Sequence, residues 1–258
     1  MAKVTIFAAL IIMKKLSIMK INKIFKAALL AASLFVVGSV SAQNIQLHYD
    51  FGRHFYSDAE SSRPHVTLTL EQFKADNLGS WFYFVDVDMR NHGSVTAYTE
   101  IAREFNVKKD SPFAVHVEYD GGVNEHGAFQ HVALAGGAYN WHSEDFSKTW
   151  SLQLLYRQMF GGGGVKAMSG AQLTTVWGVN FANNKLTFSG FADVWYGYKS
   201  VIGESAKGFV FITEPQLWFN ITNKFSMGTE FEISHNFIYS NTDTRFFVNP
   251  TLAAKVKF

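Results

Sequence analysis

Apolar and polar residues alternate along the chain from about residue 43 to its end. In the first such segment Ile45, Leu47, Tyr49 and Phe51 fall on one face, and Gln46, His48, Asp50 and Gly52 fall on the other. A period of two places alternate side chains on opposite faces of a β-strand, whereas an amphipathic helix needs a period near 3.6. Helical periodicity is almost absent, so this part of the chain is predicted to be all-β.

Turn-forming residues interrupt the alternation every 15 to 20 residues and divide it into strands. We expect twelve, at 44–54, 64–73, 80–90, 94–105, 112–122, 129–140, 147–160, 170–181, 185–197, 208–220, 224–236 and 246–258. The connections after odd-numbered strands are longer, as at 55–63, 161–170, 198–207 and 237–245, and those after even-numbered strands are tighter, as at 182–184 and 222–223. This asymmetry is typical of an outer-membrane barrel with both termini in the periplasm. The sequence therefore predicts a single antiparallel transmembrane β-barrel over residues 43–258.

The main competing fold is a secreted soluble β-sandwich, which would show the same alternation. Two features favour the barrel. Aromatic residues lie near strand ends, where the girdles of a membrane barrel would lie: Tyr49, Phe51, Trp81, Trp141, Trp150, Trp177, Trp218 and Phe219. The chain also ends on Phe258 after an alternating segment, and a terminal aromatic on the last strand resembles the assembly signal of bacterial outer-membrane proteins.

The first 42 residues have the pattern of an export signal. Six lysines and no acidic residue occur there; an apolar run covers residues 27–40, and Val40, Ser41 and Ala42 resemble a cleavage site. We therefore predict a signal peptide over residues 1–42, cleaved after Ala42. Residues 1–18 are interpreted as an upstream extension, because Met19 alone would open a complete signal. A membrane anchor is the alternative, but the apolar run is too short to span a bilayer.

Composition narrows the function once the signal is set aside. Without the six lysines of the signal peptide, the chain has 17 basic and 21 acidic residues, a net charge of −4. The sequence therefore lacks the excess of basic residues that nucleic-acid binding requires. The chain contains no cysteine, which excludes disulfides, thiolate metal sites and a cysteine nucleophile. We expect a protein of the bacterial outer membrane whose partners are its lipid, small solutes, and the export and barrel-assembly machinery.

A run of motifs between residues 69 and 105 resembles a known family. These motifs are Thr69-Leu70-Glu71-Gln72-Phe73-Lys74, then Trp81-Phe82-Tyr83-Phe84, then Asn91-His92-Gly93-Ser94, then Tyr98-Thr99-Glu100-Ile101. In this order they are similar to the N-terminal third of the Tsx-type nucleoside-specific outer-membrane channels. The resemblance covers about 40 residues and the terminal Phe, and Arg103 departs from the family's spacing by one residue. It implies a divergent branch that shares the fold and the transport class.

The lumen of such a barrel must take its selectivity from inward polar and aromatic side chains. The alternation places many carboxylates inward with a few basic groups: Asp50, Glu71, Asp86, Asp88, Glu100, Glu118, Asp120, Asp193, Glu214, Glu230 and Glu232, with His48, His116, Arg157, Lys255 and Lys257. They could form an ion-pair network that only holds the barrel's shape, or a track that binds solute.

A nucleoside track needs aromatic faces for the base and carboxylates for the ribose hydroxyls. The candidate pathway residues are Phe82, Phe84, Asp86, Asp88, His92, Tyr98, Glu100, Arg157, Phe191, Asp193, Trp195 and Glu214. Nucleosides or similar small polar solutes are therefore the expected cargo, and the acidic excess disfavours anions.

Two other classes of function are compatible with an outer-membrane barrel. An outer-membrane enzyme of protease or phospholipase type would need a nucleophile and a base on one face, but adjacent Ser234 and His235 point to opposite faces. His48 and Asp50 share a face without a nucleophile beside them. A plugged structural or adhesive barrel is the remaining alternative. No catalytic residue, cofactor or metal is expected, since no metal-ligand spacing or phosphate loop stands out.

Overall fold

The computed structural model describes residues 42–258 except 61, 91–94, 125–126, 162–165, 200–205 and 238–244. The predicted signal peptide lies outside these residues apart from Ala42, and the predicted turn at 91–94, with His92, lies outside them as well. Both remain predictions. No helix among the described residues is long and apolar enough to cross a membrane.

The described residues form thirteen strand segments and one single-turn helix. In chain order they are β1 (Ala42–Asp50), α3 (Gly52–Phe55), β2 (Val66–Asp76), β3 (Gly79–Met89), β4 (Val95–Asn106), β5 (Phe113–Asn124), β6 (Gly127–His142), β7 (Lys148–Met159), β8 (Met168–Phe181), β9 (Leu186–Tyr198), β10 (Lys207–Thr213), β11 (Gln216–Asn220), β12 (Phe225–His235) and β13 (Phe246–Lys257).

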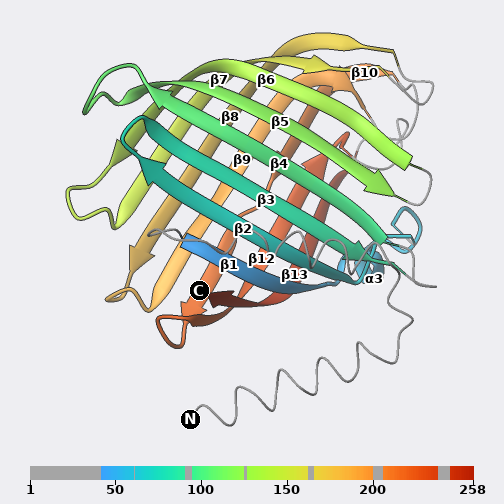
Figure 1. The fold of residues 1–258 in the computed structure, drawn as a ribbon. Coiled ribbons are helices and arrows are strands. Elements are labelled where there is room, and N and C mark those ends of the chain that lie inside the picture. The colour runs from blue at the N-terminus through green and yellow to red at the C-terminus, as the bar shows by residue number, and fades with distance from the viewer. Residues whose placement is uncertain are drawn as a thin grey trace.

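The strands close into one antiparallel barrel (Figure 1). Apart from β10 and β11, each strand pairs with its neighbours in the sequence, and β1 pairs with both β2 and β13, which removes the free edges. β10 and β11 each pair with β9 and with β12, so they are the two halves of one strand. The barrel therefore has twelve strands, as the sequence predicts.

Two local predictions are wrong. The strand expected over 208–220 is interrupted at Glu214 and Pro215, because proline has no N–H to donate to a neighbouring strand. The first strand, expected to reach residue 54, ends at Asp50. The carboxylate of Asp50 accepts a hydrogen bond from the Gly52 backbone N–H at 2.6 Å, and the chain turns there into α3.

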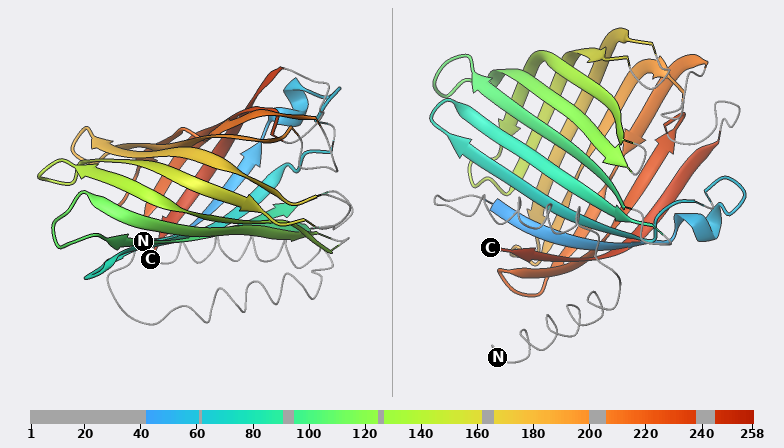
Figure 2. Two further views of the ribbon diagram at one scale, coloured as in Figure 1. Left: turned by 90° about the horizontal axis from the view of Figure 1, so that it is seen from above. Right: turned by 45° about the vertical axis from the view of Figure 1, so that its right-hand side comes forward.

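The connections segregate to the two ends of the barrel as predicted. The tight connections at 77–78 and 182–185 lie at the end where β1 begins and β13 finishes, and α3 lies at the opposite end, where the longer connections join their strands (Figures 1 and 2). Assignment of the first end to the periplasm remains a prediction.

The two faces of the wall differ in polarity. In β1, Ile45, Leu47 and Tyr49 are exposed on the outside, whereas Gln46 and His48 are buried on the inside. The same alternation runs around the barrel, so the outer surface is apolar, and the inner surface carries the polar and charged residues together with a few buried apolar clusters. Backbone groups paired around a closed barrel and an apolar exterior are what the bilayer requires of strands. The wall therefore has the architecture of a transmembrane β-barrel.

The segment around Ala135, Gly136, Gly137 and Ala138, which has little sequence pattern, contains a close contact between β6 and β7. A Cβ on Gly136 would collide with the Leu154 carbonyl oxygen and lie 2.9 Å from the Leu155 Cα, whereas a Cβ on Gly137 would meet nothing within 4 Å. Overpacking of this kind typically costs about 1–3 kcal/mol.

We expect Gly136→Ala to lower the free energy of unfolding by about 1–3 kcal/mol, because β6 and β7 must separate to admit the methyl group. Urea unfolding of the lipid-refolded protein measures this. Gly137→Ala is the matched control and should unfold like the parent. Equal effects of the two substitutions would contradict the close approach.

Candidate functional site

The inner wall of the barrel carries the predicted pathway residues. The strand pairing and the burial of alternate residues place ten of them there: Phe82, Phe84, Asp86, Asp88, Tyr98, Glu100, Arg157, Phe191, Asp193 and Trp195. Glu214 falls in the interruption between β10 and β11 but interacts electrostatically with Glu230 and Glu232, which places it on the same side. The candidates thus share one surface, although not one cluster.

One part of this wall, formed by β3 and β4, joins aromatic rings to carboxylates. The rings of Phe82 and Phe84 have centroids 6.1 Å apart, and those of Phe84 and Tyr98 are 5.9 Å apart. The Tyr98 hydroxyl donates to Glu100 Oε1 at 2.8 Å, and Asp86 accepts a hydrogen bond from Thr69 on β2. Phe82, Phe84 and Tyr98, which we name the aromatic ladder, therefore lie beside acceptors of hydrogen bonds.

A second part of the wall centres on Arg157 of β7. Its guanidinium lies 4.8 Å from the ring centroid of Trp195 on β9, and its Nε donates to Gln172 at 3.1 Å. Arg157 also interacts electrostatically with Tyr98 and Asp193. The structure thus brings residues that lie far apart in the sequence into one polar region.

The mouth of the barrel at the α3 end contains a charged network. The sequence analysis placed its Asp50 and Glu232 inward but missed its other members. Arg63, from the connection between β1 and β2, is buried, and its Nη2 lies 2.8 Å from both Asp50 Oδ2 and Glu232 Oε2. Glu60, also buried, accepts a hydrogen bond from Asn249 at 3.1 Å. We call these five residues the mouth network. They fix the connection against the wall formed by β1, β12 and β13.

The mouth network contains a carboxyl group that titrates near neutrality. Burial raises the pKa of Glu60 to about 7; Arg63 and Asn249 lower it in part, and Glu232 and Asp50 raise it. A carboxyl whose pKa is higher in the folded state stabilises that state fully below its unfolded pKa, and this contribution is lost as pH rises through about 7.

We therefore expect Glu60 to make the barrel less stable as pH rises from about 4.5 to 7. Glu60→Gln, which stays neutral, should remove this part of the pH dependence. Thermal unfolding midpoints measured across this range test the prediction, with exposed Glu144→Gln as control. A pH profile unchanged by Glu60→Gln would contradict it.

The prediction that Trp218 belongs to the outer aromatic girdle is wrong. Tyr49, Trp81, Trp141, Trp150 and Phe219 are exposed on the outer face near strand ends. Trp218 instead points inward and is almost fully buried. Its Nε1 donates to Gln216 Oε1 at 2.8 Å, and the Lys255 ammonium lies 3.7 Å from its ring centroid. Trp218 lies two residues from both Gln216 and Asn220 along β11, so all three side chains point to the same face. This alternation could have placed Trp218 on the inner wall.

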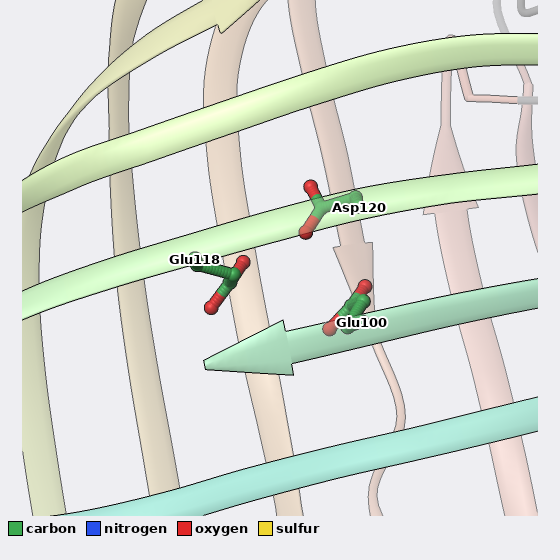
Figure 3. A group of neighbouring side chains, drawn as sticks. All are labelled: Glu100, Glu118 and Asp120. Carbon is green, nitrogen blue, oxygen red and sulfur yellow. The ribbon is translucent and has the colours of Figure 1, made fainter. Parts of the chain in front are cut away.

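Carboxylates outnumber basic groups on the inner wall. Glu104, which the sequence analysis did not place inward, adds to them by contacting His116 at 3.2 Å. The nearest oxygens of three others, Glu100, Glu118 and Asp120, lie within 4.8 Å of one another (Figure 3), the one such set among the described residues that could hold a metal ion. The inner wall among the described residues therefore carries an excess of acidic groups.

Comparisons with known proteins agree with the architecture. A family model described as a domain of unknown function (DUF5020) matches residues 42–258. A search of curated proteins finds no significant match. Among solved structures, the NanC porin superposes with a TM-score of 0.54 at 12% identity, covering 84% of this chain and 100% of that one.

The KdgM porin gives a TM-score of 0.48 at 12% identity, covering 85% of this chain and 99% of that one. Its complex with disordered oligogalacturonate gives 0.49 at 10% identity with the same coverage. At such identities the likeness to NanC shows the fold alone, which is that of an outer-membrane porin.

Proposed function

The chain belongs to the DUF5020 family, a domain of unknown function, and we propose that it is an outer-membrane channel for passive, selective diffusion of nucleosides or similar small polar solutes. The observation that carries this proposal is the aromatic ladder of Phe82, Phe84 and Tyr98 beside the carboxylates of Asp86 and Glu100. No chemical step and no cofactor are part of the proposed role.

The chemistry of a nucleoside matches this wall. Its base is flat and can stack on successive aromatic rings, and its ribose hydroxyls can donate to carboxylates. Conduction also requires that each contact be weak and repeated along the path. The ladder offers rings at intervals of about 6 Å, and the resemblance of residues 69–105 to the Tsx-type channels supports the same class of solute.

The acidic excess of the wall limits the solutes further. Nucleotides and acidic sugars would meet the carboxylates of Asp86, Asp88 and Asp193. Arg157 interacts electrostatically with Asp193 only among these three. Repulsion by like charges in a confined lumen should slow such anions relative to neutral solutes. Uncharged nucleosides are therefore the favoured cargo over nucleotides.

A plugged structural or adhesive barrel is the second candidate, and the mouth network favours it. Arg63 and Glu60 hold part of one connection against the wall at the α3 end. A buried cluster of Trp195, Val210 and Ile212 adds bulk to the inner wall. An enzyme is not proposed, since Ser234 is buried and donates to Glu232, while His235 stacks on Phe246 on the other face.

Asp86→Asn and Glu100→Gln should each reduce the preference for adenosine over a sugar of similar size by about fivefold, the equivalent of one net hydrogen bond. The change removes charge while keeping shape, so the barrel should still fold. The preference is measured as the ratio of labelled adenosine uptake to labelled sugar uptake into liposomes that contain each variant.

The matched control is Glu144→Gln, in an exposed turn outside the wall. If the two inner-wall variants transport like the parent and the control, the carboxylates are structural and the proposed track is wrong.

A further inference from the structure

Three carboxylates converge on the inner wall where β4 and β5 pair. Glu100 lies directly opposite Asp120 in the register of the two strands, and Glu118 lies two residues before Asp120 on the same face. One oxygen from each residue comes within 4.8 Å of the others (Figure 3). Like charges directly opposite each other destabilise a sheet, so this arrangement needs a counter-charge or a proton shared between the carboxyl groups.

Protein groups supply only part of that counter-charge. His116 lies 2.9 Å from Glu118, and the Tyr98 hydroxyl donates to Glu100. Arg157 interacts electrostatically with Asp120, but its guanidinium is held over Trp195, and among the described residues it makes no ion pair within 4.0 Å of the three carboxylates.

Asp120 provides an independent sign of a missing ligand. Its side chain is buried, with 7% of the residue exposed, and its Oδ1 has no hydrogen-bond partner in the described part of the chain. Buried carboxylate oxygens are normally satisfied, because an unpaired one loses its hydration without compensation. Immediately after Asp120 the register of β5 against β6 shifts, and such irregularities often re-aim a side chain.

We propose that Glu100, Glu118 and Asp120 bind one divalent cation, Ca²⁺ in preference to Mg²⁺, inside the lumen. The donors are all oxygen, which suits hard cations. Ca²⁺ accepts several carboxylates in a flexible geometry, whereas Mg²⁺ requires a near-ideal octahedron and is usually held by only one or two carboxylates, so a set of three favours Ca²⁺. The three oxygens lie within 4.8 Å of one another, which is close enough for one ion to contact all of them.

The site is expected to be weak and completed by water, because three protein ligands leave at least three of the six to eight positions of Ca²⁺ open. Asp193 lies outside the trio but interacts electrostatically with Glu100 and Asp120, so its negative charge would favour a bound cation. Arg157 and a protonated His116 would oppose the ion. A bound cation would remove negative charge from the middle of the lumen.

Terbium luminescence tests this site directly in the refolded, chelator-treated barrel, because Tb³⁺ mimics Ca²⁺ and Tyr98 beside Glu100 can sensitise it. We expect saturable emission that Ca²⁺ displaces more effectively than Mg²⁺. Asp120→Asn should weaken binding by about tenfold or more, since ligand charge sets the affinity of such sites. Glu118→Gln provides a second variant if the first does not fold.

The matched control is Asp88→Asn, another inner-wall carboxylate, which accepts a hydrogen bond from Thr67 at 2.6 Å and lies outside the trio. Retained binding in this control, with loss in Asp120→Asn, supports the site. Absence of binding in the folded parent, equal binding in Asp120→Asn, or equal loss in both variants would each overturn it. The assay measures no transport, so its outcome is separate from that of the proposed channel.

Discussion

Replacing Arg63 by alanine is expected to lower the free energy of unfolding by about 3–5 kcal/mol, the typical cost of removing one partner from a buried ion pair. Arg63 is buried and bridges Asp50 and Glu232, with Nε 2.9 Å from Asp50 Oδ2 and Nη2 2.8 Å from Glu232 Oε2. Without the guanidinium these two carboxylates would repel each other in a site from which water is largely excluded. Urea unfolding in lipid vesicles measures the loss.

The neighbouring ion pair between Arg245 and Asp58 offers a control at the same end of the barrel. Its atoms are 2.9 Å apart, close to the 2.8 Å of the Arg63 pairs, but about half or more of each side chain is exposed. Exposed pairs contribute about 0–1 kcal/mol, so Arg245→Ala should change stability little. If Arg63→Ala and Arg245→Ala have the same small effect, the mouth network is not the stabilising element described above.

Placing an arginine at Leu154 on the outer face should destabilise the folded barrel by about 2–4 kcal/mol, because a guanidinium at the midplane of the bilayer loses its hydration. Leu154 lies in the middle of β7, and 66% of its surface is exposed on the outside of the wall. In a soluble sheet an exposed arginine there would cost almost nothing. Unfolding from lipid vesicles distinguishes the two environments.

Val115→Arg is the depth control for this substitution. Val115 is also exposed on the outer face but lies near the beginning of β5, close to one end of the barrel. The cost of a charge falls to about 0–1 kcal/mol near the membrane interface. Equal costs at Leu154 and Val115 would contradict the membrane orientation of the wall.

The alternation of apolar and polar residues was sufficient to predict the class of fold, the twelve strands and the inner face. Each side chain's parity along a strand decides its face, and this local rule placed His48, Asp86 and Trp195 correctly. The rule failed at Pro215, because proline has no N–H for strand pairing and interrupts the strand. It also failed at Trp218, which was assigned to the outer aromatic girdle because it lies near a strand end.

The candidate site was predicted only in part, because parity says nothing about which residues face each other across strands or about how connections fold. The register that sets Glu100 opposite Asp120 depends on the geometry of the whole wall. Arg63 lies in a connection with no periodic pattern, and only the three-dimensional path of that connection brings it between Asp50 and Glu232. Long-range contacts of this kind leave no signal in a single sequence.

Single-channel conductance of the refolded mature protein in a planar bilayer tests the central claim most directly. Adenosine, uridine and a sugar would be titrated against the open current. The proposed channel predicts discrete openings and saturable block by the two nucleosides but not by the sugar. Openings without block would contradict nucleoside selectivity, and absence of conductance from protein shown to be folded would contradict the channel itself.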